Sequence, residues 1–474
     1  MEVFKIIGDI LIYAFFAYAI FLMSSYVILA IISFKTSSTY KKKNEFIDYD
    51  DILVSELAPS VTLIAPAYNE GMTIIENVRS LLSINYANFE VLIINDGSKD
   101  DTLEKLKETY ELERVNYAVN YKVETKEVKG VYKSKNAAFS HLVVVDKVNG
   151  GKADALNVGV NIASCDYIAC IDVDCVLEPD SILKLMKPFL EEEREVIATG
   201  GVIRIANSCE IESGQLKKIN VPTSWIARIQ VVEYFRAFLL GRMAWSKLDG
   251  LLLISGALGV FKKDRVIEVG GYDHNTVGED MELVMRLSKY MGENELPFKV
   301  AFIPDPLCWT EAPDNWKIWT RQRNRWTRGT IECLLAHKDM MLNPKHKVLG
   351  MLSVPYWFLF EWLAPITEAL GYVLVIVSLI FGWINWTYFV LMFVFVYSFA
   401  VIFSAAALLI EELTYHQYEK QSQVWKLFWI SLLEPFFYHP MVVYAAIRGN
   451  IDFLTGKSNW GEMTRSGFKK TDQK

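Results

Sequence analysis

The stretch Tyr167-Ile-Ala-Cys-Ile-Asp-Val-Asp-Cys175 joins a short apolar run to two carboxylates, Asp172 and Asp174. A bounded apolar run of this length is typical of a buried strand, so both carboxylates are expected at a strand end. Paired carboxylates are suitable ligands for a divalent cation that bridges to a diphosphate. An Asp-x-Asp pair alone is equally compatible with a capped or solvated turn, so the interpretation depends on the rest of the chain.

Two earlier apolar runs also end in polar residues. Residues 61–65 lead into Pro66-Ala-Tyr-Asn-Glu70, and residues 91–94 lead into Asn95-Asp-Gly-Ser-Lys-Asp-Asp101, with an amphipathic segment at 100–112. Strands that alternate with helical segments predict an α/β domain with a mostly parallel, Rossmann-like sheet. Nucleotides bind at the carboxyl ends of such strands, so the three polar ends are expected to form one site. Residues 119–148 carry no chemical signal and are expected to be a surface excursion.

Two later blocks add charged residues. Gly151-Lys-Ala-Asp-Ala-Leu-Asn157 places Lys152 in a loop after a glycine, from which its ammonium group could approach phosphates. Thr276-Val-Gly-Glu-Asp-Met-Glu-Leu283 places Asp280 at the start of an amphipathic helix, where the helix dipole favours an ionised carboxylate. Acidic residues in a first helical turn are also common for helix stability alone.

The block Arg321-Gln-Arg-Asn-Arg-Trp-Thr-Arg328 places Gln322, Arg325 and Trp326 on one face of a helix, because they are three and four residues apart. An indole ring with neighbouring polar groups can stack on a sugar. The alternative is a basic helix on anionic lipid with Trp326 as its anchor. In that case the other arginines would face the lipid: Arg321, Arg323 and Arg328.

In this order, the blocks resemble the membrane-embedded, processive family 2 glycosyltransferases, which include the cellulose, poly-N-acetylglucosamine, hyaluronan and chitin synthases. The resemblance covers nearly the whole chain and implies a GT-A-type domain. It implies that Asp172 and Asp174 hold Mg²⁺ or Mn²⁺, that Asp280 is the general base, and that Trp326 and Glu279 bind the acceptor. It assigns the remaining residues to the nucleotide sugar: Tyr68, Glu70, Asp96, Lys152, Gln322, Arg325 and Arg465.

The chain departs from the family pattern in two places. The family usually has Thr-Glu-Asp where this chain has Gly278-Glu279-Asp280, so Glu279 or the backbone would have to orient Asp280. The tail Asn459-Trp-Gly-Glu-Met-Thr-Arg465 is only loosely similar to the tails of hyaluronan and chitin synthases, because two residues separate Gly461 from Thr464.

The chain of 474 residues is 52% hydrophobic, and its apolar residues are concentrated in four stretches, 10–34, 357–386, 388–410 and 424–447. Each approaches the roughly 20 residues that span a bilayer. No cleavage site follows the first stretch, and lysines follow it at once, which favours a membrane helix whose end faces the cytosol. Glu361, Glu368 and Glu434 lie in apolar surroundings, either facing a wet path for a glycan or at interfacial depth.

These patterns predict an N-terminal transmembrane helix at 1–40, a cytosolic domain at 41–346 with amphipathic interface helices at about 216–247 and 313–340, and transmembrane or re-entrant helices at 347–450. The resemblance implies that the cytosolic domain is the GT-A glycosyltransferase domain and that 451–474 is a cytosolic tail with a gating segment. Three crossings after residue 346 would leave this tail outside. The favoured explanation is that Pro435 and Pro440 break 424–447 into an interfacial or re-entrant helix pair. The alternative separates 349–363 from 367–386.

The resemblance implies a multi-pass hexosyltransferase of a bacterial-type plasma membrane. Asp280 would deprotonate an acceptor hydroxyl that attacks a UDP-sugar with inversion, giving a β-linked polysaccharide extruded through the protein's own helices. UDP-glucose is the favoured donor. The alternative enzyme adds a single sugar to a polyprenyl phosphate or glycolipid.

Expected partners are the UDP-sugar, the growing polysaccharide, the lipid bilayer, and accessory export or regulatory subunits. A transporter or scaffold with a degenerate nucleotide fold is disfavoured because every expected polar strand end is retained. The net charge of −7 and the absence of a basic tract interleaved with aromatic residues exclude general nucleic-acid binding.

Overall fold

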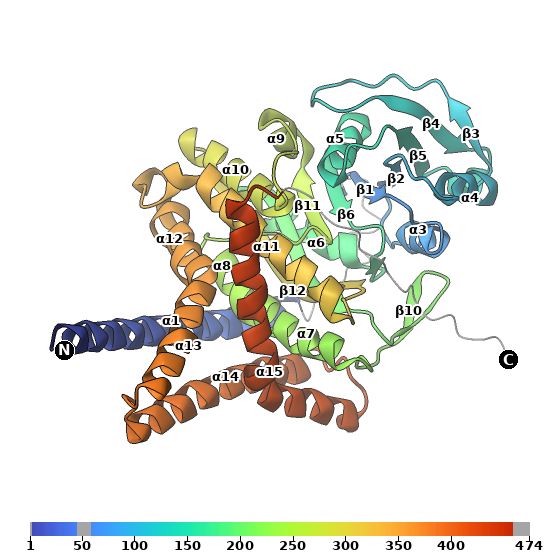
Figure 1. Cartoon of the computed structure of the whole chain (residues 1–474). Helices are drawn as coiled ribbons and strands as arrows, with labels where there is room; N and C mark the ends of the chain where they lie inside the picture. Colours follow the sequence, from blue (N-terminus) through green and yellow to red (C-terminus); the bar gives the residue numbers. More distant parts are fainter. Residues whose placement is uncertain (1, 45–57, 458–474) are drawn as a thin grey trace.

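The computed structural model describes residues 2–44 and 58–457 of the chain, with side chains from residue 13 onward. An α/β domain stands against a group of long apolar helices (Figure 1). The two parts share one hydrophobic core, which includes residues of the sheet and of the C-terminal helices.

The α/β domain is built on a ten-stranded sheet with the order β3-β4-β5-β2-β1-β6-β11-β8-β12-β7. Strands β5, β2, β1 and β6 run parallel at its centre, and β8 is parallel to β12. The predicted α/β class with a parallel, Rossmann-like centre is confirmed. The bounds are β1 Val61–Ala67, β2 Phe89–Asn95, β3 Leu112–Val115, β4 Val128–Ser134, β5 Leu142–Lys147, β6 Tyr167–Ile171, β7 Val176–Leu177, β8 Glu195–Ile205, β11 Leu258–Lys262 and β12 Phe298–Thr310.

Helices pack against the sheet and bury its central strands. Residues 61–65 of β1 and 91–94 of β2 are buried, as expected for parallel strands covered on both faces. Helix α5 contacts both strands. The helices of this domain are α3 Ile74–Leu82, α4 Thr102–Thr109, α5 Lys152–Ile162, α6 Ser181–Glu191, α9 Lys263–Glu268, α10 Glu279–Glu293 and α11 Trp316–Ala336.

The stretch 119–148 contains two strands of the sheet, β4 and β5, so the expected surface excursion is wrong for residues 128–147. β5 pairs in parallel with β2, and its run Leu142-Val-Val-Val145 is buried. β4 pairs antiparallel with β5 and extends the sheet toward its edge. The charged residues of β4 obscured this pattern, although the apolar run of β5 alone matches a central strand.

A continuous helical segment lies between the sheet and the apolar helices. It consists of α7 (Trp225–Phe235), η2 (Arg236–Arg242) and α8 (Met243–Lys247), and it contacts α1, α14 and α15 as well as β8 and β12. The helix predicted at 216–247 therefore begins only at Trp225. Strand β10 (Gln215–Lys218) pairs with β9 (Glu210–Glu212) in the preceding segment.

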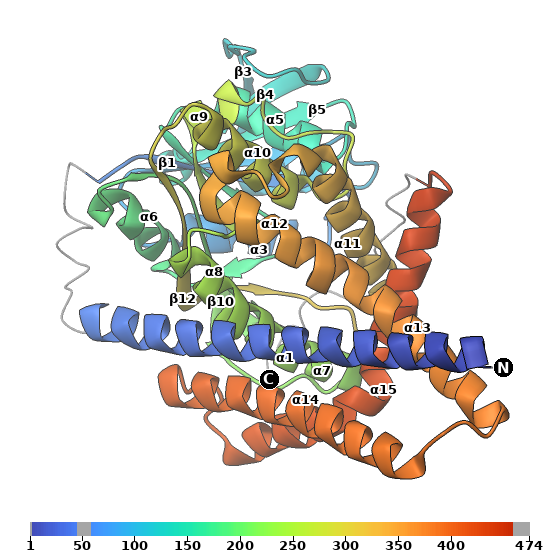
Figure 2. The same cartoon turned by 90° about the vertical axis from the view of Figure 1, so that its left-hand side faces the viewer.

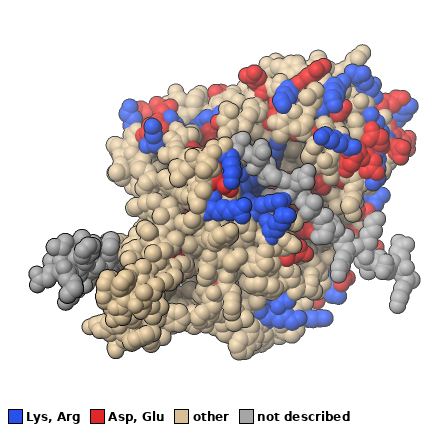
Figure 3. All heavy atoms as spheres, in the orientation of Figure 1, with Lys and Arg blue, Asp and Glu red and all other residues tan. Residues whose placement is uncertain are grey.

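Four helical stretches in the described part of the chain are long and apolar enough to cross a membrane. They are Tyr13–Asn44 within α1 (Glu2–Asn44), Leu349–Ile380, α14 (Trp386–Thr414) and α15 (Gln421–Leu454). The second comprises η5 (Leu349–Ser353), α12 (Val354–Tyr356), η6 (Trp357–Trp362) and α13 (Leu363–Ile380). Figure 2 shows α1 running beside α14, where the rings of Tyr26 and Phe403 stack at 5.4 Å. The surface over α13 and α14 is almost free of charged side chains (Figure 3), as lipid contact requires.

Helix α15 is continuous across Pro435 and Pro440, so the expected break into a helix pair is wrong. The alternative break near residue 363 is absent too, because Leu349–Ile380 is one helical stretch. The two prolines bend α15 midway instead (Figure 1), since each removes a helix hydrogen bond. The second half of α15 runs along α11, where Asn324 Nδ2 donates to Asp452 Oδ2 at 2.9 Å. This bend returns the chain to the α/β domain.

Candidate active site

A cavity of about 1180 Å³ opens at the carboxyl ends of the central strands. Its wall consists of the segments after β1, β2 and β6, the start of α10 and one face of α11. Arg465 lies outside the described residues. The other predicted site residues all line this cavity: Tyr68, Glu70, Asp96, Lys152, Asp172, Asp174, Glu279, Asp280, Gln322, Arg325 and Trp326.

The segment after β1 supplies an aromatic and an acidic side chain. Tyr68 is 44% exposed, so its ring is available for stacking. Glu70 Oε2 accepts a hydrogen bond from the hydroxyl of Thr73 at 3.1 Å, just before α3. This geometry permits contact with a nucleotide, and the roles of Tyr68 and Glu70 stay predictions.

The side chain of Asp96 is hydrogen-bonded to other residues of the protein. Its carboxylate pairs with Lys147 Nζ at 2.6 Å and accepts the backbone N–H groups of Gly150 at 2.9 Å and Gly151 at 2.8 Å. Lys147 is fully buried and also pairs with Asp154 at 2.6 Å. Asp96 therefore shapes the glycine loop before α5 from the cavity wall, and its predicted contact with the nucleotide stays a prediction.

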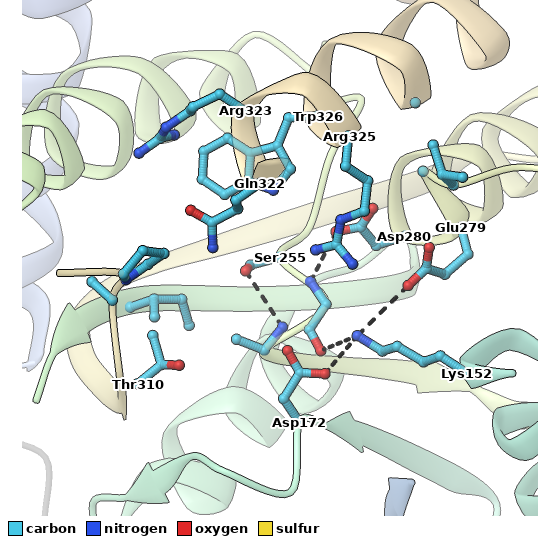
Figure 4. Close-up of a pocket in the computed structure, with 18 of the residues that line it drawn as sticks. Lys152, Asp172, Ser255, Glu279, Asp280, Thr310, Gln322, Arg323, Arg325 and Trp326 are labelled. Carbon is cyan, nitrogen blue, oxygen red and sulfur yellow. Dashed lines mark hydrogen bonds and ion pairs between the residues drawn. The ribbon is translucent and has the colours of Figure 1, made fainter. Parts of the chain in front are cut away.

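Lys152 links two acidic parts of the site. It is the first residue of α5 rather than part of the predicted loop, and Gly151 precedes it at φ +86°, a conformation that favours glycine. Its Nζ lies 2.5 Å from Asp172 Oδ1 and 3.6 Å from Glu279 Oε1 (Figure 4). Burial opposes the charged form, but Asp172 and Glu279 together raise the pKa of Lys152 above its usual value. Lys152 is therefore a permanent cation at neutral pH.

The backbone orients Asp280. Its Oδ2 accepts the N–H of Gly256 at 3.0 Å, and its Oδ1 accepts the N–H of Met281 at 2.9 Å. The backbone, one of the two substitutes expected for the missing threonine, thus orients this carboxylate, and the role of Asp280 as the base stays a prediction. The neighbouring Glu279 faces Lys152, and burial raises the pKa of its carboxyl while Lys152 opposes that rise.

Position 278 is a glycine because a side chain there would clash with α11. A Cβ atom there would lie 2.9 Å from the Cα of Gly329 in α11, which is closer than ordinary van der Waals contact. The φ of Gly278 is −117°, so the requirement is for space and not for backbone freedom. The close contact of the two glycines brings the start of α10, with Glu279 and Asp280, directly against α11.

Helix α11 presents three predicted residues to the cavity. Trp326 is 41% exposed, and Gln322 and Arg325 point into the cavity beside it (Figure 4). Arg323 and Arg328 are buried, so the interpretation of these two as lipid-facing arginines is wrong. The guanidinium of Arg323 lies 4.0 Å from the centre of the Trp326 ring.

Asp172 and Asp174 could supply two of the ligands of a divalent cation. Both follow β6 and line the cavity, and carboxylate oxygens are the donors that Mg²⁺ and Mn²⁺ prefer. Within residues 2–44 and 58–457, no cluster of three or more acidic, histidine or cysteine ligands is present. Two carboxylates suit an ion that takes its other ligands from a diphosphate and water.

The cavity extends to the membrane helices. Arg242 of η2, Trp357, Glu361 and Trp362 of η6, and Val442 of α15 line its far side. Of these residues, only Glu361 carried a signal in the sequence, where it was expected either to face a wet path for a glycan or to lie at interfacial depth, and its place in the cavity agrees with the first. Glu434 instead pairs with Arg236 at 2.6 Å, and Glu368 pairs with His439 at 2.7 Å.

This arrangement provides the groups for transfer between an anionic donor and a hydroxyl acceptor. Asp280 can accept a proton, and Lys152 and Arg325 can stabilise negative charge on a leaving group. Asp172 and Asp174 can hold a cation against that group, and the Trp326 ring can support a sugar.

Comparisons with known proteins agree with this chemistry. The sequence profile described as glycosyltransferase-like family 2 matches residues 58–329. Poly-β-1,6-N-acetyl-D-glucosamine synthase of Staphylococcus epidermidis is 28% identical over 307 residues, which cover 65% of this chain and 62% of that protein. The enzyme of the same name from Staphylococcus aureus strain COL is 28% identical over 324 residues, 68% of this chain and 66% of that protein. The chain thus spans less than two thirds of the length of these relatives.

A solved structure shares the fold. The mannosyltransferase of Pyrobaculum calidifontis, in complex with GDP-Man and Mn²⁺, superposes with a TM-score of 0.51 at 16% identity, covering 92% of this chain and 100% of that one. This likeness agrees with the predicted GT-A-type fold. Since the family profile matches more than half of the chain, the protein belongs to glycosyltransferase family 2.

Proposed function

We propose that this protein is a processive, inverting glycosyltransferase that polymerises N-acetylglucosamine from UDP-N-acetylglucosamine into a β-linked polysaccharide. The observation that carries the proposal is the single cavity, which joins the carboxylate pair, Asp280 and Trp326 and then continues between membrane helices. The sugar is inferred from the poly-β-1,6-N-acetyl-D-glucosamine synthases. The predicted preference for UDP-glucose has no support among these relatives.

In the proposed reaction, Asp280 removes the proton from the acceptor hydroxyl as that oxygen attacks the anomeric carbon. The diphosphate leaves from the opposite face, which inverts an α-linked donor to a β-linked product. The hydrogen bonds from Gly256 and Met281 fix the carboxylate, so little reorganisation is needed when the acceptor arrives. Lys152 and Arg325 stabilise the charge of the departing diphosphate.

Mg²⁺ or Mn²⁺ is the proposed cofactor, with Asp172 and Asp174 as its protein ligands. A bound cation would neutralise charge on the diphosphate. In the structure described, Lys152 pairs with Asp172 and so already balances part of its charge. Tyr68, Glu70 and Asp96 are the proposed nucleotide contacts, and Gln322 is proposed to contact the donor or acceptor.

The membrane part is proposed to carry the product outward from a cytosolic catalytic domain at 41–346. Residues 1–40 and 347–450 would cross or enter the bilayer. Trp357, Glu361 and Trp362 extend the cavity beside the Trp326 platform, and aromatic faces with a carboxylate suit a hydrated glycan. The bend in α15 returns the chain to the α/β domain, and residues 458–474 of the predicted tail at 451–474 lie outside the described residues.

The second candidate is transfer of one sugar to a lipid acceptor. The opening of the cavity toward membrane helices would also admit a polyprenyl phosphate. The three tryptophans of the cavity lining, Trp326, Trp357 and Trp362, favour a retained chain, because a single-transfer enzyme needs no platform for earlier sugars.

The decisive experiment incubates membranes containing the full chain with labelled UDP-N-acetylglucosamine or UDP-glucose and sizes the product. A long polymer from UDP-N-acetylglucosamine is expected. Asp280→Asn should reduce turnover by at least about 100-fold, since a positioned base contributes about that much. A lipid carrying one sugar as the sole product would exclude the processive function, and full activity of Asp280→Asn would exclude Asp280 as the base.

A further inference from the structure

A buried polar cluster connects the bend of α15 to α11. Tyr438 lies between Pro435 and Pro440 and is only 1% exposed. Its hydroxyl accepts a hydrogen bond from Trp319 Nε1 at 2.8 Å and donates to Glu233 Oε2 at 2.8 Å. The bend in the membrane helix is therefore attached to both α11 and α7.

Arg323 connects this cluster to the cavity. Its Nη2 donates to Glu233 Oε2 at 2.7 Å and to the Tyr438 hydroxyl at 3.3 Å. Together with the Trp319 bond, this uses the full hydrogen-bonding capacity of the hydroxyl, one donor and two acceptors. The same guanidinium covers the Trp326 ring at 4.0 Å from its centre. Trp326 is otherwise 41% exposed, so Arg323 is a specific support for one face of the indole.

Helices α11 and α15 are in close contact beyond this cluster. A Cβ atom at Gly449 of α15 would lie 2.9 Å from Thr327 Cβ and 3.0 Å from the carbonyl oxygen of Asn324. Trp362 Nε1 donates to Asn450 Oδ1 at 2.8 Å, which ties a cavity-lining tryptophan to the same half of α15. A displacement of α15 at its bend would therefore move the surroundings of Trp326.

We propose that Glu233, Arg323 and Tyr438 are positioning residues that hold the Trp326 ring in its acceptor-binding orientation and thereby set the length of the product. This rests on the proposed function, in which Trp326 supports the growing glycan. Tyr438 does not line the cavity, so it acts through Arg323 and Trp326 rather than by touching the sugar.

Tyr438→Phe in the full-length protein tests the proposal, because it keeps the ring and removes only the hydroxyl. The substitution removes three hydrogen bonds, of which the one from Arg323 bears on the Trp326 ring, and the loss of that one bond corresponds to about a fivefold effect. The acceptor KM for a short N-acetylglucosamine oligosaccharide should rise by about this factor and the mean product length should fall, while the KM for the donor stays at its wild-type value. Tyr444→Phe is the matched control, since Tyr444 lies on the same helix and is 53% exposed.

A double-mutant cycle with Trp326→Ala distinguishes positioning from general loosening of the fold. If Tyr438 acts through Trp326, the double variant should have the acceptor KM of Trp326→Ala alone. Additive effects, or a Tyr438→Phe protein indistinguishable from Tyr444→Phe, would overturn the proposal. Trp319→Phe provides a second test should Tyr438→Phe fail to accumulate, with the same expected change, because Trp319 is buried, does not line the cavity and donates to the Tyr438 hydroxyl.

The identity of the wild-type product separates a failure of this inference from a failure of the proposed function. If the wild-type product is a lipid with one sugar, the proposed function fails. The acceptor KM for that lipid then replaces product length as the readout, and an unchanged value in Tyr438→Phe overturns the positioning role.

Discussion

Replacing Gly278 by threonine should damage the enzyme, although threonine is the usual residue of the resembling family at this position. The added Cβ would lie 2.9 Å from Gly329 Cα, whereas ordinary contact begins at 3.4 Å, so α10 and α11 must separate by about 0.5 Å. Overpacking of this kind costs about 1–3 kcal/mol of folding free energy. Asp280 follows two residues later and would move with α10. Because a misplacement of about 1 Å can cost about 100-fold in rate, we expect turnover to fall about tenfold.

The assay measures UDP release in detergent together with the temperature at which the protein aggregates. Gly278→Ala should have a smaller effect of the same sign, since it adds only the Cβ. Gly371→Thr is the control for a glycine-to-threonine change, because a Cβ at Gly371 meets no atom within 4 Å. Wild-type turnover and wild-type thermal stability in Gly278→Thr would refute the steric explanation for this glycine.

Lys152→Met should lower turnover by at least about tenfold, because it removes a cation near the leaving group. In the absence of nucleotide it should strengthen Mn²⁺ binding, measured by electron paramagnetic resonance, since Lys152 no longer competes for Asp172; unchanged Mn²⁺ affinity would contradict that competition. Lys147→Met should destabilise the fold by about 3–5 kcal/mol, because it leaves the Asp96 carboxylate buried without its main counter-charge. The control, Lys129→Met, removes an exposed lysine 3.9 Å from Asp146, a pair worth at most about 1 kcal/mol, so equal losses of thermal stability in the two variants would be inconsistent with this explanation.

The chemistry-bearing residues were predictable because they follow local patterns. Apolar runs locate the strands, and parallel strands bring their carboxyl ends to one edge, so Asp172, Glu70 and Asp96 had to approach one another. The helical spacing of Gln322, Arg325 and Trp326 likewise fixed their common face. The structure places all of these residues around one cavity.

The predictions that the structure contradicts concern contacts between segments that are distant in the sequence. The sequence pattern did not indicate that β5 enters the sheet beside β2, or that Lys147 would reach Asp96 from its end. The prolines of α15 predicted a break, but a bend forms because Tyr438 and the helix around it are packed against α7 and α11.

The sequence by itself determined which strands end in candidate site residues and where the long apolar stretches lie, since both depend on patterns within about 10 to 20 residues. Only the tertiary structure decided how Gly278 meets Gly329, how Arg323 supports Trp326, and where α15 turns. These features depend on which side chains and backbones pack together across the chain, and dense packing leaves space for one arrangement that no local spacing specifies.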